Sequence, residues 1–385
     1  MIRNYIGEDY KGTGLPKLPV ETALIYKAWS PWSYSHHPHI TFFRDRFYVM
    51  FSNGWIDEDD VGQRVMLSTS DDFVHWTTPS PLVDTRMGEH FGLTFTAGGW
   101  HVHQGTLVAY IGEYEYDLPP GSRKPDHIQE TPHKNTKTWA LTSTDGEHWG
   151  QPIPILERFV PNHGPQPIRS GRLIMCGGMM FPYTDDPSGL SGWIPAGIYP
   201  RKMPRPYVDD SVGFRQAAPY FETPHPVLNE GSFIQTDDGV LHMLLRSGTD
   251  RLWHTYSTDD GETWSIPERT EFTDSVAKFH LGRLPGSGAA EPERGGRFYY
   301  VGNPSTQREY RTLLVLSLSR DGEDWTDSYI LRNEETAPIF EGTYKDHGYQ
   351  YPHSMVLENH LYVVYSINKE DVGVLRLSLD SLPPE

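Results

Sequence analysis

A turn with the pattern Ser-x-Asp-x-Gly-x-x-Trp recurs along this chain and constrains its fold more than any other feature. The pattern is complete at residues 257–264. Two shorter versions end at Trp149 and Trp325, and a fourth, which ends at Trp76, has Phe73 in place of the glycine. In such a turn the aspartate accepts backbone N–H groups, the glycine takes a positive φ, and the tryptophan packs between strands. Four copies, each behind a predicted strand, indicate an all-β propeller.

Six strand-rich units with the same internal plan follow one another along the chain. The clearest unit spans residues 31–76, where short strands alternate with turns. Each unit begins with a polar stretch, and in a propeller this first strand lines the central channel. The chain has no convincing linker, so we predict a single domain over residues 1–385. An apolar strand at residues 23–26 is expected to pair with the C-terminal unit and close the ring, which removes exposed sheet edges.

The charge of the chain argues against several classes of partner. Its 51 acidic and 33 basic residues give a formal net charge of −18, so neither nucleic acid nor an anionic membrane is an expected partner. The single cysteine, Cys176, excludes an internal disulfide framework. The first residues, MIRNYIGEDYKGTG, contain no apolar signal-peptide core, which predicts a cytoplasmic protein. If a leader has been removed from the chain as given, a secreted or periplasmic location is expected instead.

Histidine is concentrated at the predicted starts of the inner strands. The candidate site residues at these positions are His36, His37, His101, His103, Asn162, His163, Gln166, Glu230, His280, Arg283, Tyr351 and His353. An imidazole with a pKa near ~6.5 can act as a base, an acid or a ligand. The same histidines could instead fill a wet channel by hydrogen bonding. They could also bind a transition metal, through His101 and His103, which share one face of a strand, or through His36, His37 and His39. The metal assignment stays open.

Carboxylate pairs, which would indicate an ordinary glycosidase, are not found at the starts of the inner strands. Glu230 is the acid at such a position, and the run DEDD at residues 57–60 is interpreted as a solvated loop tip. Three arginines on one substrate carboxylate would indicate a sialidase. Arg64, Arg246 and Arg283 approximate that set without matching it clearly.

The run YSHHPHITFF, followed by FSNG, GQRVM, STSDDFVHW and GGWHVHQGTLVAYIGEYE, resembles a family of propeller enzymes. These are the L-rhamnose-α-1,4-D-glucuronate lyases of polysaccharide lyase family 42 and the related sequences described as glycoside hydrolase family 145. The resemblance covers most of the chain and is clearest over residues 31–150. It implies a seven-bladed β-propeller, here with sialidase-like Asp-box turns, whose seventh blade comes from the termini or from residues 182–223; six blades also fit the chain. It also allows a central calcium ion.

The resemblance implies the release of terminal L-rhamnose from rhamnose-α-1,4-glucuronate caps of arabinogalactan. The reaction is a β-elimination, which leaves an unsaturated glucuronate. It needs a base for the C5 proton, a group that holds the carboxylate, and a proton for the leaving oxygen. By motif the base is His103, with His101 as the alternate. His36 or His37 corresponds to the histidine of the hydrolase-type relatives.

Arg246 and Arg283 are predicted to hold the substrate carboxylate, because a guanidinium binds it bidentately. The other residues predicted to bind substrate are His36, His37, Asn162, His163, Gln166, Glu230, His280, Tyr351 and His353. Two further functions remain open: a propeller glycoside hydrolase, either an α-L-rhamnosidase or a sialidase-like exo-glycosidase, and a non-catalytic sugar-binding propeller. The expected partner is an acidic oligosaccharide or polysaccharide, and the sequence itself requires no cofactor.

Overall fold

The computed structural model describes residues 2–383, apart from residues 5, 7, 8, 10, 90, 117, 124–133, 199–227, 287–295 and 326. In this part of the chain the regular elements are strands, apart from the short 3₁₀ helix η2 (Leu379–Ser381). No helix among the described residues is long and apolar enough to cross a membrane. The predicted all-β class is therefore confirmed.

The strands form six sheets that follow the chain in order. In each sheet the inner strand pairs antiparallel with the second strand. The six inner strands are β3 (Tyr34–Phe43), β7 (Leu93–His103), β11 (His163–Pro167), β14 (Asn229–Gln235), β18 (His280–Arg283) and β23 (Tyr349–Leu357). They correspond to the six units predicted from the sequence.

The remaining strands lie progressively farther from the centre. The second strands are β4 (Arg46–Gly54), β8 (Thr106–Glu115), β12 (Leu173–Cys176), β15 (Leu241–Arg246), β19 (Phe298–Gly302) and β24 (His360–Ile367). The third strands are β5 (Arg64–Ser70), β9 (Lys134–Ser143), β13 (Tyr183–Thr184), β16 (Arg251–Ser257), β20 (Leu314–Ser319) and β25 (Asp371–Ser378). The outer strands are β2 (Glu21–Tyr26), β6 (Ser80–Val83), β10 (Ile153–Glu157), β17 (Glu268–Thr273) and β22 (Asp327–Arg332).

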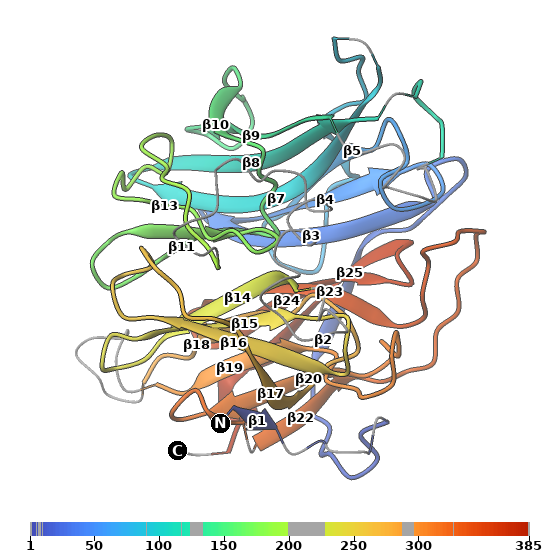
Figure 1. Cartoon of the computed structure of the whole chain (residues 1–385). Helices are drawn as coiled ribbons and strands as arrows, with labels where there is room; N and C mark the ends of the chain where they lie inside the picture. Colours follow the sequence, from blue (N-terminus) through green and yellow to red (C-terminus); the bar gives the residue numbers. More distant parts are fainter. Residues whose placement is uncertain are drawn as a thin grey trace.

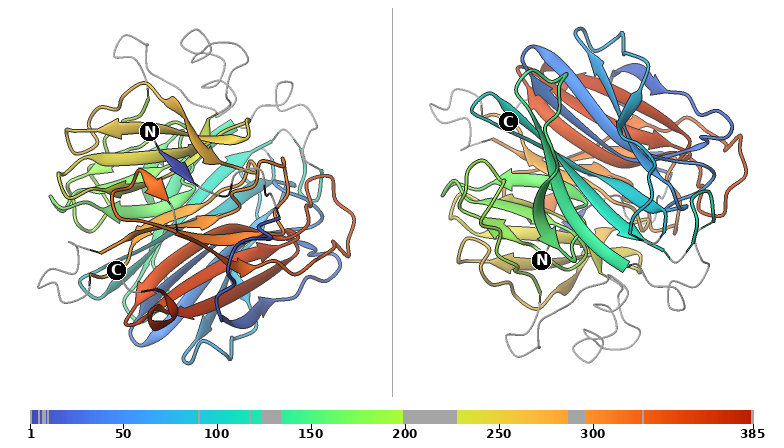
Figure 2. Two further views of the ribbon diagram at one scale, coloured as in Figure 1. Left: turned by 90° about the horizontal axis from the view of Figure 1, so that it is seen from below. Right: turned by 90° about the horizontal axis from the view of Figure 1, so that it is seen from above.

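The inner strands surround a central channel. β3 contacts β7, and β7 contacts β11. The third sheet meets the fourth through β12 and β14, and the circle continues through β18 and β23 back to β3. Both views in Figure 2 show the red strands of the last sheet beside the blue strands of the first. The six sheets therefore close into a β-propeller.

The N-terminal residues join sheets formed by distant parts of the chain. β2 pairs antiparallel with β25, as predicted for residues 23–26. β1 (Arg3–Asn4) runs parallel to β17 and to β21 (Asp324–Trp325), and lies between them in the fourth sheet (Figure 1). In the stretch 182–223, β13 belongs to the third sheet, and residues 199–223 lie outside the described residues. The described residues thus give six sheets, and seven blades are not confirmed.

The Asp-box turns have the predicted hydrogen bonds. Asp321 Oδ1 accepts the amide N–H groups of Glu323 and Asp324 at 2.8 and 2.9 Å. The indole N–H of Trp325 donates to the carbonyl oxygen of Gly322 at 3.1 Å, and Gly322 has a φ of 79°. Phe73, which replaces the glycine in the first box, also takes a positive φ, of 72°. The structural role predicted for these turns is confirmed.

Apolar side chains fill the space between neighbouring sheets. Between the first and second sheets, Met50 and Val65 pack in one cluster with Phe95 and Leu107, and all four are fully buried. Alternation along a strand sends successive side chains to opposite faces. The sheet faces therefore form the core, and the strand ends at the channel remain for polar groups.

Candidate active site

A cavity of about 500 Å³ lies at the end of the channel where the inner strands begin. It is lined by parts of several sheets and by the loops between them. Five cationic and five acidic side chains line it: Arg158, Arg246, Arg308, Arg311 and Lys369, and Glu58, Asp59, Glu230, Glu309 and Asp346. In a chain with a net charge of −18, the lining of this cavity is balanced in charge and so is less negative than the chain as a whole.

Three inner strands carry an irregularity near their beginnings, and each directs one side chain at the cavity. Register shifts interrupt the pairing of β3, β14 and β23 with their neighbours. At these points His37, Glu230 and Tyr351 have φ values of 47°, 46° and 54°. Positive φ is sterically costly for such residues, and bulges of this kind often re-aim functional side chains. All three side chains line the cavity.

Arg246, the last residue of β15, joins two of these side chains. Its Nη1 forms an ion pair with the Glu230 carboxylate and donates to Tyr351 Oη at 2.5 Å. The side chains of Arg246 and Glu230 are 22% and 10% exposed, so water shields their attraction only weakly. His37 Nε2 lies 3.9 Å from the second carboxylate oxygen of Glu230. We call Tyr351, Glu230, Arg246 and His37 the Tyr351 cluster.

The surroundings of the Tyr351 cluster set its protonation. Burial raises the pKa of Tyr351 well above its ordinary value, and Arg246 opposes this only in part. Burial alone would also raise the pKa of Glu230, but Arg246 and His37 hold it below the ordinary value. Burial lowers the pKa of His37 to about 4. At neutral pH the cluster therefore combines a protonated phenol, an ionised carboxylate, a guanidinium and a neutral imidazole.

Two further cations lie near the Tyr351 ring. The guanidinium carbon of Arg311 is 5.6 Å from the ring centre, and the Nζ of Lys369 is 5.7 Å away. Arg311 Nη1 donates to Asp346 at 2.7 Å, so its position is fixed. Lys369 Nζ donates to Glu58 Oε2 at 2.8 Å. Arg246 and Arg311 offset part of the cost that burial places on a negative charge at the phenol oxygen, although the pKa of Tyr351 stays raised.

The acidic run at residues 57–60 is not a solvated loop tip, and that interpretation is wrong. Asp57 and Asp60 are 0% and 1% exposed. Asp57 accepts the backbone N–H groups of Thr343 and Tyr344, the second at 2.9 Å. Because Thr343 and Tyr344 also line the cavity, Asp57 fixes one of its walls.

The other two acids of this run line the cavity. Glu58 pairs with Lys369, and Asp59 accepts a hydrogen bond from Tyr114 Oη. Both therefore belong to the wall of the same cavity as the Tyr351 cluster. Sequence reasoning missed them because a DEDD run is usually a solvated surface feature.

Five residues predicted from the sequence line the cavity: His37, Asn162, Glu230, Arg246 and Tyr351. His36 packs against Tyr351 with ring centres 3.8 Å apart, and it is fully buried. Sequence reasoning missed Arg311 as well, although an arginine just before a strand in an acidic chain is a usable signal. Arg64 stacks on Trp32, with its guanidinium carbon 3.5 Å from the ring centre, and is not a cavity residue.

Three other predicted residues lie farther along the channel. His163, His280 and His353 meet with His39, and their ring centres are 4.4 to 6.0 Å apart. The residues that line the cavity include none of these four. We call them the channel histidines, and the predicted sugar-binding role of His163, His280 and His353 stays a prediction.

Arg283 and Gln166 lie at the opposite end of the inner strands from the cavity. They line a separate cavity of about 410 Å³. The Nη2 of Arg283 donates to Asp237 at 2.8 Å. Arg283 and Arg246 therefore do not meet, and the structure does not bring them together on one carboxylate as the sequence predicted.

His101 and His103 lie at the end of an inner strand and not at its start. β7 begins at Leu93, so the expectation that residues 100–103 open this strand is wrong. Both side chains are partly exposed beside a hairpin turn, and His101 Nε2 lies 2.8 Å from the Pro187 carbonyl oxygen. The structure gives neither histidine a place in the cavity, and their catalytic role remains an untested prediction.

The described residues that could hold a metal ion do not fit the calcium ion that the resemblance allows. Two groups of described residues have ligand atoms close enough to hold an ion: His39 with His163 and His353, and His36 with His37 and Glu58. Calcium takes six to eight oxygen ligands. Both groups consist mainly of imidazoles, so we derive no role for calcium.

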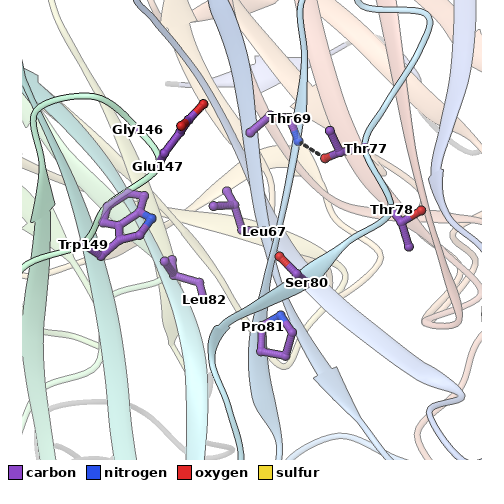
Figure 3. Close-up of a pocket in the computed structure, with 10 residues that line it drawn as sticks. All are labelled: Leu67, Thr69, Thr77, Thr78, Ser80, Pro81, Leu82, Gly146, Glu147 and Trp149. Atoms are coloured by element: carbon purple, nitrogen blue, oxygen red, sulfur yellow. Dashed lines mark hydrogen bonds between the residues drawn. The ribbon is translucent and has the colours of Figure 1, made fainter.

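A groove of about 360 Å³ lies away from the channel, between the outer strands of the first sheet and the second Asp-box turn (Figure 3). Leu67, Leu82 and Trp149 provide its apolar surface, and the amide of Thr69 donates to Thr77 Oγ1 at 2.9 Å. Glu147 is its one ionisable side chain among the described residues. This groove lacks the combination of groups that catalysis needs.

Comparison with protein families places most of the chain in one of them. The family described as BNR repeat-like domain matches residues 57–363. The family described as the N-terminal beta propeller of BT_1020-like proteins matches residues 26–87. No curated protein matches the chain.

Solved structures share the fold at low sequence identity. A sialidase has a TM-score of 0.65 and 19% identity over 97% of this chain, which spans only 35% of that sialidase. A Dyadobacter fermentans protein of unknown function has a TM-score of 0.63 and 16% identity, over 95% of this chain and 99% of its own. The intramolecular trans-sialidase of Ruminococcus gnavus, solved with oseltamivir carboxylate, has a TM-score of 0.62 and 13% identity, over 94% and 98%. At such identities the likeness concerns the fold.

Proposed function

The chain belongs to the family of BNR repeat-like domains, and we propose that it is a glycoside hydrolase that releases a terminal acidic sugar from an oligosaccharide. The observation that carries the proposal is the contact of Arg246 with both Glu230 and Tyr351 in the cavity. The fold shared with a sialidase and a trans-sialidase supports a propeller glycosidase.

In the proposed reaction Tyr351 is the nucleophile. Its Oη attacks the anomeric carbon, and Glu230, which is ionised, takes the phenol proton. Asp59 in its protonated form donates a proton to the leaving glycosidic oxygen. Water then hydrolyses the bond between Tyr351 and the sugar and gives one proton back to Asp59, while Glu230 returns its proton to the phenol oxygen, as in glycosidases with a tyrosine nucleophile. Glu230 is thus the base for an otherwise weak nucleophile.

Arg246 is proposed to recognise the acidic sugar. Its hydrogen bonds to Glu230 and Tyr351 both use Nη1. Among the described residues this leaves its other N–H groups for a substrate carboxylate, which a guanidinium binds bidentately. Arg311 and Lys369, which also lie near the Tyr351 ring, are proposed to attract the same substrate carboxylate.

The rhamnose-releasing β-elimination stays the alternative. Its predicted bases, His103 and His101, are outside the cavity, so the cavity itself does not favour that reaction. Pure sugar binding is the second alternative, and the balance of charge in the cavity is compatible with it.

The test is incubation with oligosaccharides that end in a sialic acid, in glucuronate, or in rhamnose linked to glucuronate. Product masses and ultraviolet absorbance are then measured. Hydrolysis gives a saturated acidic sugar with one added water. Elimination gives an absorbing unsaturated uronate, and binding without product indicates a sugar-binding module; either result rejects the proposal.

Variants tie the activity to the cavity. Tyr351→Phe should remove turnover, whereas Tyr256→Phe, an exposed tyrosine on β16, should retain it. Full turnover in Tyr351→Phe would show that this phenol is not the nucleophile.

A further inference from the structure

The channel histidines take no part in the proposed reaction, yet three of them have the arrangement of a ligand set. The ligand nitrogens of His39, His163 and His353 all lie within 4.8 Å of one another. His39 and His353 each lie two residues beyond a bulge residue, His37 and Tyr351, on the first and last inner strands. The bulges therefore direct one layer of side chains to the cavity and the next layer into the channel.

We propose that His39, His163 and His353 bind a divalent transition metal inside the channel. This inference is independent of the proposed function. Zinc binds imidazole nitrogen at ~2.0–2.1 Å, and a tetrahedral site places its ligand atoms about 3.3 Å apart. A bound ion would therefore have to draw the three nitrogens, which lie within 4.8 Å of one another, closer together. Imidazole suits zinc, copper, iron and nickel, whereas calcium requires oxygen ligands.

The hydrogen bonds of His163 prepare one of its nitrogens for a metal. Its Nε2 lies 2.9 Å from the carbonyl oxygen of Phe279, which can only accept a hydrogen bond. The ring proton is therefore on Nε2, and Nδ1 carries a free lone pair. This Nδ1 is buried and has no hydrogen-bond partner among the described residues. A histidine held by a backbone carbonyl on one nitrogen is a common form of metal ligand.

His39 is the strongest candidate ligand. The side chain is fully buried, and neither ring nitrogen has a hydrogen-bond partner within the described residues. Buried polar groups are normally paired, so both nitrogens need an explanation. The indole N–H of Trp100 donates to the His39 backbone oxygen at 3.0 Å, which fixes the residue in place.

His353 is the weakest ligand of the three. The amide N–H of Ile40 donates to its Nδ1 at 3.3 Å, and this bond competes for a lone pair. His280 is the fourth channel histidine. The Ser354 amide donates to its Nδ1 at 3.2 Å, so the lone pair of this nitrogen already has a partner. Buried Lys278 has its own fixed partner, since its Nζ donates to the Asn162 carbonyl oxygen at 2.9 Å.

Such a metal would stabilise the folded propeller. Its ligands come from the first, third and sixth sheets, so the ion would join strands across the channel that share no backbone hydrogen bonds. Because a metal that binds only the folded state raises its stability, the expected readouts are metal content and melting temperature.

The experiment uses the full chain, purified without a metal-affinity column. The protein is unfolded in chelator and refolded with Zn²⁺, with Ca²⁺ or with no metal. We expect about one zinc per chain by mass spectrometry after dialysis, as a three-ligand site predicts. We also expect a higher Tm with Zn²⁺ than with Ca²⁺ or no metal. Co²⁺ should give the visible absorption bands of a nitrogen-ligated site.

Substitutions identify the ligands. His39→Phe and His163→Phe should lose the bound zinc and the Zn²⁺-dependent rise in Tm, and His353→Phe should weaken both less. His254→Phe, on β16, is the matched control and should keep both. Zinc retained at the wild-type level in His39→Phe and His163→Phe would overturn the proposal. If those variants do not fold, wild-type protein without cobalt bands or zinc uptake overturns it equally, and shows that the histidines only fill the channel.

Discussion

Replacing Arg246 by lysine tests the central contact of the candidate site. Lysine keeps the positive charge beside Glu230 but loses the planar fork that can hold a carboxylate with two parallel hydrogen bonds. A hydrogen bond to a charged group contributes roughly 1.5–3 kcal/mol. Since 1.4 kcal/mol corresponds to a factor of ten, Arg246→Lys should lower kcat/KM on an acidic substrate by roughly 10- to 100-fold.

The way in which the kinetic constants change identifies the role of the fork. If Arg246 holds the carboxylate in the ground state as well as in the transition state, most of the loss appears as a higher KM. The assay is initial-rate kinetics on an oligosaccharide with a terminal acidic sugar, and on its neutral amide. The preference for the acid over the amide should fall in Arg246→Lys.

Measurements of stability distinguish the role of Arg246 in substrate recognition from its role in folding. Arg246→Lys should change the Tm little, because Glu230 keeps a cationic partner. Arg246→Met leaves that buried carboxylate unpaired and should lower the free energy of unfolding by ~3–5 kcal/mol. Arg283→Lys, at the other end of the channel, is the comparison. Wild-type kcat/KM in Arg246→Lys together with a loss in Arg283→Lys would refute our placement of the site.

Three further predictions concern the Tyr351 cluster and the Asp-box turns. Tyr351→Phe should lower turnover by ~10²-fold or more with little change in Tm, and turnover near that of wild type would mean that another group attacks the sugar. The pKa of Glu230 is held below its ordinary value, so its stabilising contribution is fully present above pH ~4.3 and is lost as the pH falls further. Tm profiles against pH should therefore be flatter on the acid side for Glu230→Gln, and parallel profiles would contradict this. Trp325→Ala, which removes a fully buried side chain, should lower the free energy of unfolding by ~3–5 kcal/mol. Trp264→Ala should cost less because that ring is partly exposed, and chemical denaturation measures both.

Much of the candidate site could be predicted from the sequence because the starts of the inner strands are recognisable. His37, Asn162, Glu230 and Tyr351 were found in this way, and all line the cavity. The same rule failed for His101 and His103, because their polar pattern belongs to the end of a long strand. Strand direction cannot be derived from alternation alone, since the period of two is the same at both ends of a strand.

Other site residues could not be predicted because loops bring them to the cavity. Glu58 and Asp59 belong to an acidic run that would be solvated in most proteins. Here Asp57, their neighbour, binds backbone N–H groups near residue 343, and this distant contact turns the run inward. Nothing within the run itself signals a partner almost 300 residues away.

The sequence by itself determined the turns and strands of this protein, because their hydrogen bonds are local. Asp321 binds amides two and three residues ahead, and Gly322 supplies the positive φ that the turn requires. Only the tertiary structure decided how the strands combine: β1 joins β17 and β21, and β2 completes the last sheet. The ring also brings His37, Glu230 and Tyr351, each at positive φ beside a register shift, from three different sheets to one cavity. These are long-range effects, in which packing across the channel outweighs the preferences of individual residues.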